Sequence, residues 1–406
     1  MLTLDDFITE QKNTHMTHIE DKVLYGGVNG TRQAIFALRD MRDMLGGHGG
    51  SVSVKWDGAP AVFAGTDPRD GKFFVAKKGI FNKNPKVYKT KEDIDNDTSG
   101  DLNKKLQLAL THLPALGIKG VIQGDFLFDQ SELKTKTIDG QKYVTFHPNT
   151  IVYAIPEAQA GTVKKAKMGI VWHTTYTGNT FESMSASFGV DVSKLNKSSA
   201  VWSQDAFLRD LTSATMTKRE TADVNKTLSQ IGVLFNSISG STLRTLEGNQ
   251  VLAQHIEQFN NTYVRAGQII GNSKAHTAKL IKWITAKYQK EIDARKSDKG
   301  KSTQKAKLDA LLVFFSDANK ENLTRMFELQ KLIVLAKLKL INKLNRLQNV
   351  DTFVKTRKGY KVTGAEGYVA IDKLGGDAVK LVDRMEFSYN NFSPDILKGW
   401  DSTSRG

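Results

Sequence analysis

Strand-forming segments occur in two blocks of this 406-residue chain, and a long helical stretch separates them. In the first block, from 51 to about 180, short runs such as SVSVKW, KFFVAKKG and NTIVYAIP are rich in β-branched and aromatic residues, with Gly, Asp or Asn between them. Strand patterns return after 350 in GYKVTGAEGYVAID and DAVKLVDRMEF. One explanation of this order is a single α+β domain, built on largely antiparallel strands, that is interrupted by a large all-α insertion.

The helical stretches are identified by apolar residues that recur at helical spacing. In GTRQAIFALRDMRDML, the residues Ile35, Leu38 and Met41 share one face, and a Gly-Gly pair ends the segment. Four longer amphipathic segments follow before residue 350. We therefore predict an N-terminal helical segment, 1–50, that packs on the α+β domain; a first part of that domain, 51–190; the helical insertion, 191–350; and a second part of the domain, 351–406.

The composition limits the kinds of protein and partner. The formal net charge is +15 and the pI is about 9.5, and such an excess of positive charge attracts polyanions such as nucleic acids. Cysteine is absent, which excludes disulfides and thiolate metal sites. No apolar run approaches the roughly 18 residues of a membrane span, and the N-terminus, MLTLDDFITEQ, does not resemble a secretory signal. We expect a soluble, intracellular protein without a membrane partner.

The stretch SVSVKWDGAPAVFAG places Lys55 at the end of an expected strand and follows it with Asp57 and Gly58. A lysine that acts as a nucleophile must be held in one position and be partly neutral, which nearby cations or burial can bring about. The glycine allows a tight turn around a ligand, and the carboxylate can orient the amine. A bare K-x-D-G string is more often an ordinary strand and turn, so this interpretation depends on motifs elsewhere in the chain.

The string KWDGA resembles motif I of the covalent nucleotidyltransferases, the superfamily of DNA ligases, RNA ligases and mRNA capping enzymes. Further motifs are matched in order: GVIQGDFLF resembles motif III, NTIVYAIP or MGIVWHTTYTG motif IIIa, GAEGYVAI motif IV, and DAVKLVDR motif V. The resemblance covers roughly 51–180 and 355–392 and leaves out the helical stretch. The N-terminal THMTHIEDKVLYGGVNGTRQAI is also similar to uncharacterised tailed-phage proteins.

This resemblance implies an adenylation-type fold of antiparallel sheets, with ATP as substrate and Mg²⁺ or Mn²⁺ as cofactor. Lys55 would attack the α-phosphate of ATP to give lysyl-AMP and pyrophosphate, and Lys380 would neutralise the charge that develops on that phosphate. Asp57 and Gly58 would belong to the same nucleotide-binding site as Lys55 and Lys380.

The remaining roles fall on acidic and aromatic residues. By the same resemblance, Glu366 would help to hold the metal, and Asp125 would contact the ribose or a metal-bound water. Adenine would lie against an aromatic ring, for which Trp172 and Tyr153 are the candidates.

The chain also departs from the family pattern. Motif V has a second lysine in the family, whereas Val382 stands at that position here, and the nearby Arg384 is a possible substitute. Motif III ends in Asp125 rather than glutamate, and no arginine closely follows KWDG. These changes leave open whether the activity is impaired.

A basic run after motif I is the strongest candidate for a nucleic-acid contact. Its aromatic residues, Phe81 and Tyr88, are interleaved with the cations, which suits backbone tracking with base stacking. The lysines that we expect to bind nucleic acid are Lys77, Lys78, Lys83, Lys86 and Lys89.

We expect an ATP-dependent polynucleotide ligase that seals a 5′-phosphate to a 3′-hydroxyl, with RNA favoured over DNA. Only 26 residues follow the motif V lysine, too few for the OB-fold that DNA ligases and capping enzymes carry there. The alternatives are a non-catalytic nucleic-acid-binding protein on the same fold and a nucleotidyltransferase that caps RNA or transfers AMP to protein. A phage origin would place the protein in the host cytoplasm. The sequence leaves the oligomeric state and the role of the helical insertion open.

Overall fold

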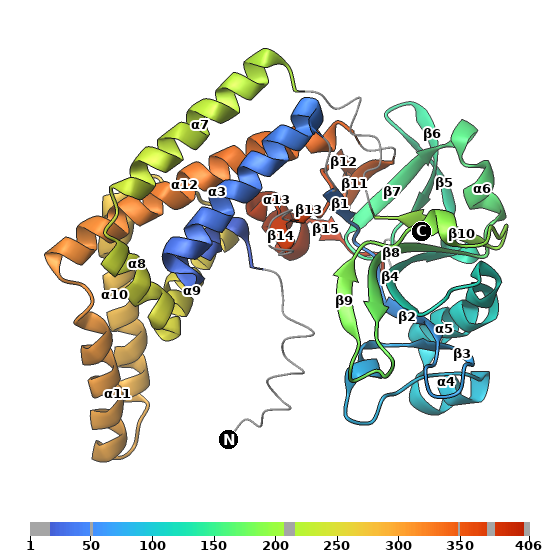
Figure 1. The fold of residues 1–406 in the computed structure, drawn as a ribbon, viewed down its shortest axis with the longest axis horizontal. Coiled ribbons are helices and arrows are strands. Elements are labelled where there is room, and N and C mark those ends of the chain that lie inside the picture. Colours follow the sequence, from blue (N-terminus) through green and yellow to red (C-terminus); the bar gives the residue numbers. More distant parts are fainter. Residues whose placement is uncertain (1–16, 49–51, 207–215, 348–349, 372–377, 402–406) are drawn as a thin grey trace.

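The computed structural model describes residues 17–48, 52–206, 216–347, 350–371 and 378–401 (Figure 1). It combines helices with sheets whose strands are largely antiparallel, which confirms the expected mixed α and β class. Helices form one lobe, two six-stranded sheets form another, and a three-stranded sheet lies between them. Across these described ranges, no helix is both long enough and apolar enough to span a membrane.

The helical lobe is assembled from two distant parts of the chain. The N-terminal part contributes α2 (Lys22–Tyr25) and α3 (Gly27–Asp43). The middle of the chain contributes α7 (Lys218–Asn236), α8 (Gly240–Gly248), α9 (Gln250–Arg265), α10 (Ser273–Asp293), α11 (Asp298–Leu312) and α12 (Asp317–Asn345). Their apolar faces meet in one core, where Leu38 and Ile333 are fully buried. A capping box of Thr217 and Glu220 sets the start of α7.

The first six-stranded sheet has the strand order β10-β8-β4-β2-β3, with β9 paired to β8. Its strands are β2 (Ala61–Thr66), β3 (Phe73–Ala76), β4 (Val121–Asp129), β8 (Met168–Thr177), β9 (Ser185–Phe188) and β10 (Val201–Asp205). All pairs are antiparallel except β8 and β10. The helices α4 (Lys91–Asp97) and α5 (Gly100–His112) belong to this part, and Leu106 of α5 is buried in the same apolar cluster as Val62 and Trp172 of the sheet.

The second six-stranded sheet combines strands from both blocks of the sequence. Its order is β12-β11-β7-β6-β5, with β15 paired to β11. The strands are β5 (Lys134–Ile138), β6 (Gln141–Phe146), β7 (Ile151–Pro156), β11 (Asp351–Thr356), β12 (Gly359–Val362) and β15 (Ile396–Leu397). A core containing Phe128 and Val171 of the first sheet and Phe146 and Tyr153 of the second joins the two sheets, and α6 (Gly161–Lys165) packs against it.

The three-stranded sheet connects the two lobes (Figure 1). It has the order β1-β13-β14 and consists of β1 (Val52–Lys55), β13 (Gly367–Ile371) and β14 (Ala378–Leu381). Tyr368 and Leu381 are fully buried in the core of the helical lobe. The helix α13 (Arg384–Phe392) follows β14 and contacts α9.

The arrangement of the segments differs from the predicted one in two respects. The N-terminal helices pack mainly against the helical lobe rather than on the six-stranded sheets, although α3 also contacts β13. Among the described residues of the middle stretch, the α-helices begin at Lys218, and Val201–Asp205, which lies inside the predicted helical insertion, forms the strand β10. That strand pairs in parallel with β8, and its short mixed sequence, VWSQD, lacks the alternation that identifies a half-buried strand.

Candidate functional site

Lys55 and Glu366 meet where β1 ends and β13 begins. The two strands pair antiparallel, and Lys55 lies opposite Gly367, the residue that follows Glu366. The Lys55 ammonium forms an ion pair with the Glu366 carboxylate, and about a third of the lysine side chain remains exposed. The strand pairing therefore joins motif I and motif IV across more than three hundred residues of sequence.

Lys380 enters the same site from β14. It lies opposite Val369, two residues beyond Gly367 on β13. Residues directly opposite one another in a sheet, and residues two apart on a strand, share a face. Lys55 and Lys380 therefore project from one face of the three-stranded sheet, while Tyr368 and Leu381 on the other face pack into the helical core.

Burial and neighbouring charge alter the proton affinity of these groups. Burial raises the pKa of Glu366, and the positive charge of Lys55 opposes this change. Burial lowers the pKa of Lys380, and the charge of Lys55 lowers it further. Among the described residues, no carboxylate lies within ion-pair distance of the Lys380 ammonium, which instead lies 5.7 Å from the centre of the Phe387 ring. The site thus holds two amines and one carboxylate in a partly dehydrated setting.

Asp57 and Gly58 fix the turn that leaves β1. The Asp57 carboxylate is buried and accepts hydrogen bonds from Asn149 Nδ2 at 2.7 Å and from the backbone N–H groups of Thr150 and Ile151 at 2.6 and 2.8 Å. A Cβ atom at position 58 would lie 2.7 Å from Asp125 Cβ, closer than real contacts allow. Asp57 therefore holds the turn against the β6–β7 connection rather than facing a ligand, and Gly58 permits the close approach to β4.

Asp125 lies next to this turn, on β4. Its carboxylate oxygen is 3.6 Å from His173 Nε2 of β8, and about a quarter of each side chain is exposed. Tyr153 is buried beside it and stacks on Trp56 with 4.8 Å between ring centres. Burial raises the pKa of Tyr153 well above its ordinary value, and the charges of Asp57, Glu366 and Asp125 add to this effect. The charges of three carboxylates thus act on one phenol.

Trp172 does not lie at this site, which corrects the expectation that it contacts adenine. Trp172 is fully buried, and its indole Nε1 donates a hydrogen bond to Ser203 Oγ at 2.9 Å. It lies opposite Gly124, whereas Asp125 lies opposite Val171, so the alternation of side chains sends Trp172 and Asp125 to opposite faces of the sheet. Trp172 belongs to the core that includes the apolar side of α5. The partly exposed aromatic residue close to Lys55 is Trp56, its next neighbour in the chain.

Ion pairs occupy much of the basic run after motif I. Asp97 accepts from Lys77 at 2.9 Å, from Lys86 at 2.7 Å and from the Tyr88 hydroxyl at 2.6 Å. Lys89 lies 2.7 Å from both Asp67 and Asp70. These contacts neutralise three of the five lysines that the sequence indicated.

Lys78 and Lys83, the other two lysines of the run, are exposed. Their contact with nucleic acid stays a prediction.

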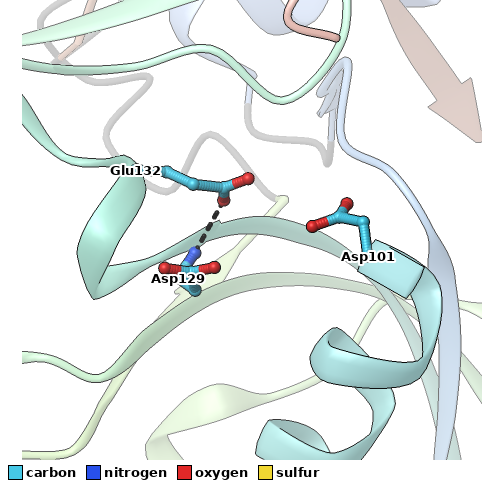
Figure 2. Close-up of side chains that lie close together, drawn as sticks. All are labelled: Asp101, Asp129 and Glu132. Atoms are coloured by element: carbon cyan, nitrogen blue, oxygen red, sulfur yellow. Dashed lines mark hydrogen bonds between the residues drawn. The ribbon is translucent and has the colours of Figure 1, made fainter. Parts of the chain in front are cut away.

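A group of three carboxylates lies away from Lys55, and Figure 2 shows its members Asp101, Asp129 and Glu132. Their oxygen atoms lie within 4.8 Å of one another. Lys104 pairs with Asp129 at 2.6 Å, and Lys105 lies 3.0 Å from Asp101 and 3.4 Å from Glu132. Each of the three carboxylates is thus within ion-pair distance of one of two lysines, so the cluster is an ion-pair network rather than an open metal site.

A second ion-pair network, which the motifs did not indicate, lies behind Lys380. Glu20 accepts from Lys337 at 2.9 and 2.8 Å, and Arg384 donates to Asp21 at 2.8 Å. All four side chains are largely buried. Arg384 is therefore committed to the N-terminal segment and does not substitute for the missing motif V lysine, while Val382 is fully buried. The signal in the sequence was the unusual lysine at the centre of an apolar helical segment, LIVLAKLKLI.

The fold and the site define a two-lobed protein of helices and antiparallel sheets, with a lysine–carboxylate pair where the lobes meet. The chain belongs to a family of unknown function (DUF6267), which matches residues 13–395. That match spans both strand blocks and the helices between them. No curated protein and no solved structure matches the chain.

Proposed function

We propose that the protein is a covalent nucleotidyltransferase that takes AMP from ATP onto Lys55, on an adenylation-type fold. The observation that supports this most is the meeting of Lys55, Glu366 and Lys380 in one small sheet, although Lys55 is separated from the other two by more than three hundred residues. Transfer of a phosphoryl group needs a fixed nucleophile and cations around the phosphate more than it needs acid–base groups. In this site, Lys55 would be the nucleophile and Lys380 the nearby cation.

In the proposed step, the Lys55 amine attacks the α-phosphorus of ATP. A P–N bond forms, the P–O bond to the β-phosphate breaks, pyrophosphate leaves with the electron pair, and the amine gives up a proton. Lys380 would neutralise the α-phosphate, since it has no carboxylate partner among the described residues and the negative charge of a bound phosphate would favour its ammonium form against the effect of burial. Asp57 would hold the turn that presents Lys55.

Mg²⁺ or Mn²⁺ fits the donor set of the site. Such cations are commonly held by one or two carboxylates together with substrate phosphates. Glu366, whose side chain is 11% exposed, and Asp125, whose side chain is 23% exposed, are two carboxylates whose charges both act on the buried Tyr153. When bound, the cation would supply charge neutralisation on the triphosphate. Glu366 would exchange its contact with Lys55 for this role, which would also release the amine.

We further propose a polynucleotide 5′-phosphate as the acceptor of AMP, followed by joining to a 3′-hydroxyl, with RNA favoured over DNA. The net charge of +15 supports a polyanionic partner. The host cytoplasm would be the place of action. One alternative has support in the structure: a nucleic-acid-binding protein without catalysis, because Val382 replaces the second motif V lysine and Arg384 is held by buried carboxylates.

Incubation with ATP labelled at the α-phosphate and Mg²⁺ tests the proposal. The wild-type protein should acquire a label that is stable to alkali and labile to hot acid, as a P–N bond is, only if Lys55 is present, so Lys55→Ala should abolish labelling. Lys142→Ala, which removes an exposed lysine on β6, is the matched control and should label normally.

A wild-type protein that stays unlabelled, or a Lys55→Ala variant that still labels, contradicts the proposal. Label from GTP instead of ATP would favour RNA capping. Single strands and nicked duplexes with a 5′-phosphate, offered to the labelled protein, test the ligation step.

A further inference from the structure

The helices α10 and α11 form a hairpin that carries nearly half of the net positive charge of the chain. From residue 273 to residue 312 the hairpin contains eleven Lys and Arg residues and four Asp and Glu residues. Its net charge is therefore +7, out of +15 for the whole chain. About a tenth of the sequence thus holds a large part of the excess positive charge.

The hairpin presents these cations to solvent. α11 packs mainly against α10, and only three of its side chains, Gln304, Leu308 and Leu311, are buried. Ten of the eleven cations are exposed, and Lys287 is partly exposed, with its ammonium 2.8 Å from Gln258 Oε1. In Figure 1 the hairpin lies at the edge of the helical lobe, away from the sheets, so its surface is accessible to a large partner.

Within the described part of the chain, none of these eleven cations forms an ion pair with a carboxylate. The neighbouring helix α12 differs, since each of its six Lys and Arg residues lies within ion-pair distance of an Asp or Glu. Two of the four hairpin carboxylates are bound by glutamine amides instead: Gln289 donates to Asp293 at 2.8 Å, and Gln304 donates to Glu291 at 2.9 Å. The positive charge of the hairpin is therefore not balanced locally.

Several of the cations are spaced so that they repel one another. Lys279 and Lys282 are three residues apart on α10, and Lys301 and Lys305 are four residues apart on α11. Side chains at these spacings are neighbours on a helix surface, and like charges there destabilise the helix. Lys290 lies on the same side of α10 as Lys279, about 16 Å further along the axis. A row of phosphates along this side would remove the repulsion.

We propose that the α10–α11 hairpin is a docking surface for the phosphate backbone of a nucleic-acid strand. A polyanion with regularly spaced charges can meet many of these lysines at once, whereas a small anion can meet only a few. Contacts to phosphate do not read the bases, so we expect little sequence preference. The inference concerns a surface away from β1, and it holds whether or not Lys55 takes up AMP.

The test is binding of a fluorescent single-stranded RNA, and of a duplex of the same length, to the full-length protein over a range of salt concentrations. The hairpin variant combines Lys279→Gln, Lys282→Gln and Lys290→Gln. It should bind about tenfold or more weakly at low salt, because three phosphate contacts and their released counterions are lost. The slope of the logarithm of the binding constant against the logarithm of the salt concentration should fall in magnitude by about two to three.

The matched control combines Lys119→Gln, Lys142→Gln and Lys358→Gln, which remove the same charge from exposed positions outside the hairpin. The control should change binding less than twofold. An equal loss in the two triple variants would mean that net charge alone attracts the strand, and this result overturns the proposal. Unchanged binding in the hairpin variant overturns it as well.

Further arms identify the partner. Binding of the single strand, the duplex or both, if it is lost in the hairpin variant, supports the proposal and shows which kind of strand docks. A wild-type protein that binds vesicles of anionic phospholipid but neither nucleic acid overturns the proposal in favour of a membrane surface. Thermal unfolding shows that the variants are folded. The hairpin variant should still take up AMP as the wild type does, so loss of strand binding and failure of the Lys55 labelling are separate results.

Discussion

At the scale of single residues, Gly58 shows how closely the turn after Lys55 is packed. The position that a Cβ atom would take lies 2.7 Å from Asp125 Cβ and 2.9 Å from the carbonyl oxygen of Phe126. Neither neighbour is the mobile end of a long side chain, so the backbone itself would have to move. The glycine thus keeps motif I and motif III in contact.

We predict that Gly58→Ala lowers the free energy of unfolding by about 1–3 kcal/mol, the usual cost of overpacking a fixed site. Gly232→Ala is the matched control, because no atom lies within 4 Å of a Cβ at that position in α7, and alanine should stabilise the helix by about 0.5–1 kcal/mol. Urea unfolding of both variants provides the measurement. A Gly58→Ala variant as stable as the wild type would show that the turn can relax.

At the scale of elements, the N-terminal 3₁₀ turn η1 (Ile19–Asp21) and the helix α12 are joined by buried charge. The Lys337 ammonium is only 1% exposed and the Glu20 side chain 5%, and they form a two-pronged pair. The positive charge of Lys337 and its neighbours lowers the pKa of Glu20 to about 2 against the effect of burial, so this carboxylate is ionised at neutral pH.

We predict that Lys337→Met lowers the free energy of unfolding by about 3–5 kcal/mol, because it leaves Glu20 buried without its partner. Lys331→Met, which removes a partly exposed pair with Glu328 on the same helix, should cost about 0–1 kcal/mol. Combining Lys337→Met with Glu20→Gln should recover a large part of the loss, since no uncompensated charge remains. Chemical denaturation checks all three variants, and a Lys337→Met loss no larger than that of Lys331→Met would contradict the argument.

At the scale of the whole molecule, stability depends on pH through buried histidines. Burial lowers the pKa of His276 to about 4, and the charge of Lys279 contributes to this change. His276 is 2% exposed in the helical core, where its Nε2 is 2.9 Å from Asn260 Oδ1. An ordinary histidine in the unfolded chain has a pKa near 6.5. Between the two values the unfolded state binds more protons than the folded state, so this histidine makes the protein less stable as the pH falls below 6.5.

Between pH 7.5 and pH 5, we predict that the free energy of unfolding of the wild type falls by about 2 kcal/mol more than that of His276→Gln. Denaturant titrations at the two pH values measure the difference, and comparing each protein with itself removes the effect of the substitution at neutral pH. An identical pH dependence in the two proteins would mean that His276 is protonated without cost in the folded state.

Patterns within single segments were sufficient for the class and for much of the site. Apolar periodicity identified the long helices, and alternation and turn residues identified most strands. The resemblance to nucleotidyltransferase motifs pointed to Lys55, Glu366 and Lys380, which the structure brings together. The strand β10 and the burial of Trp172 were missed, because a short mixed strand and the choice of sheet face depend on neighbouring strands rather than on local sequence.

The amino-acid sequence by itself determined which segments form helices and strands and which residues have the chemistry to act, because propensity and periodicity are local properties. Only the tertiary structure decided which charges pair with one another: Asp97 neutralises part of the basic run, Glu20 and Asp21 hold Lys337 and Arg384, and Glu366 meets Lys55. Ion pairing depends on a few ångströms between residues that are distant in sequence, and no local pattern records that distance.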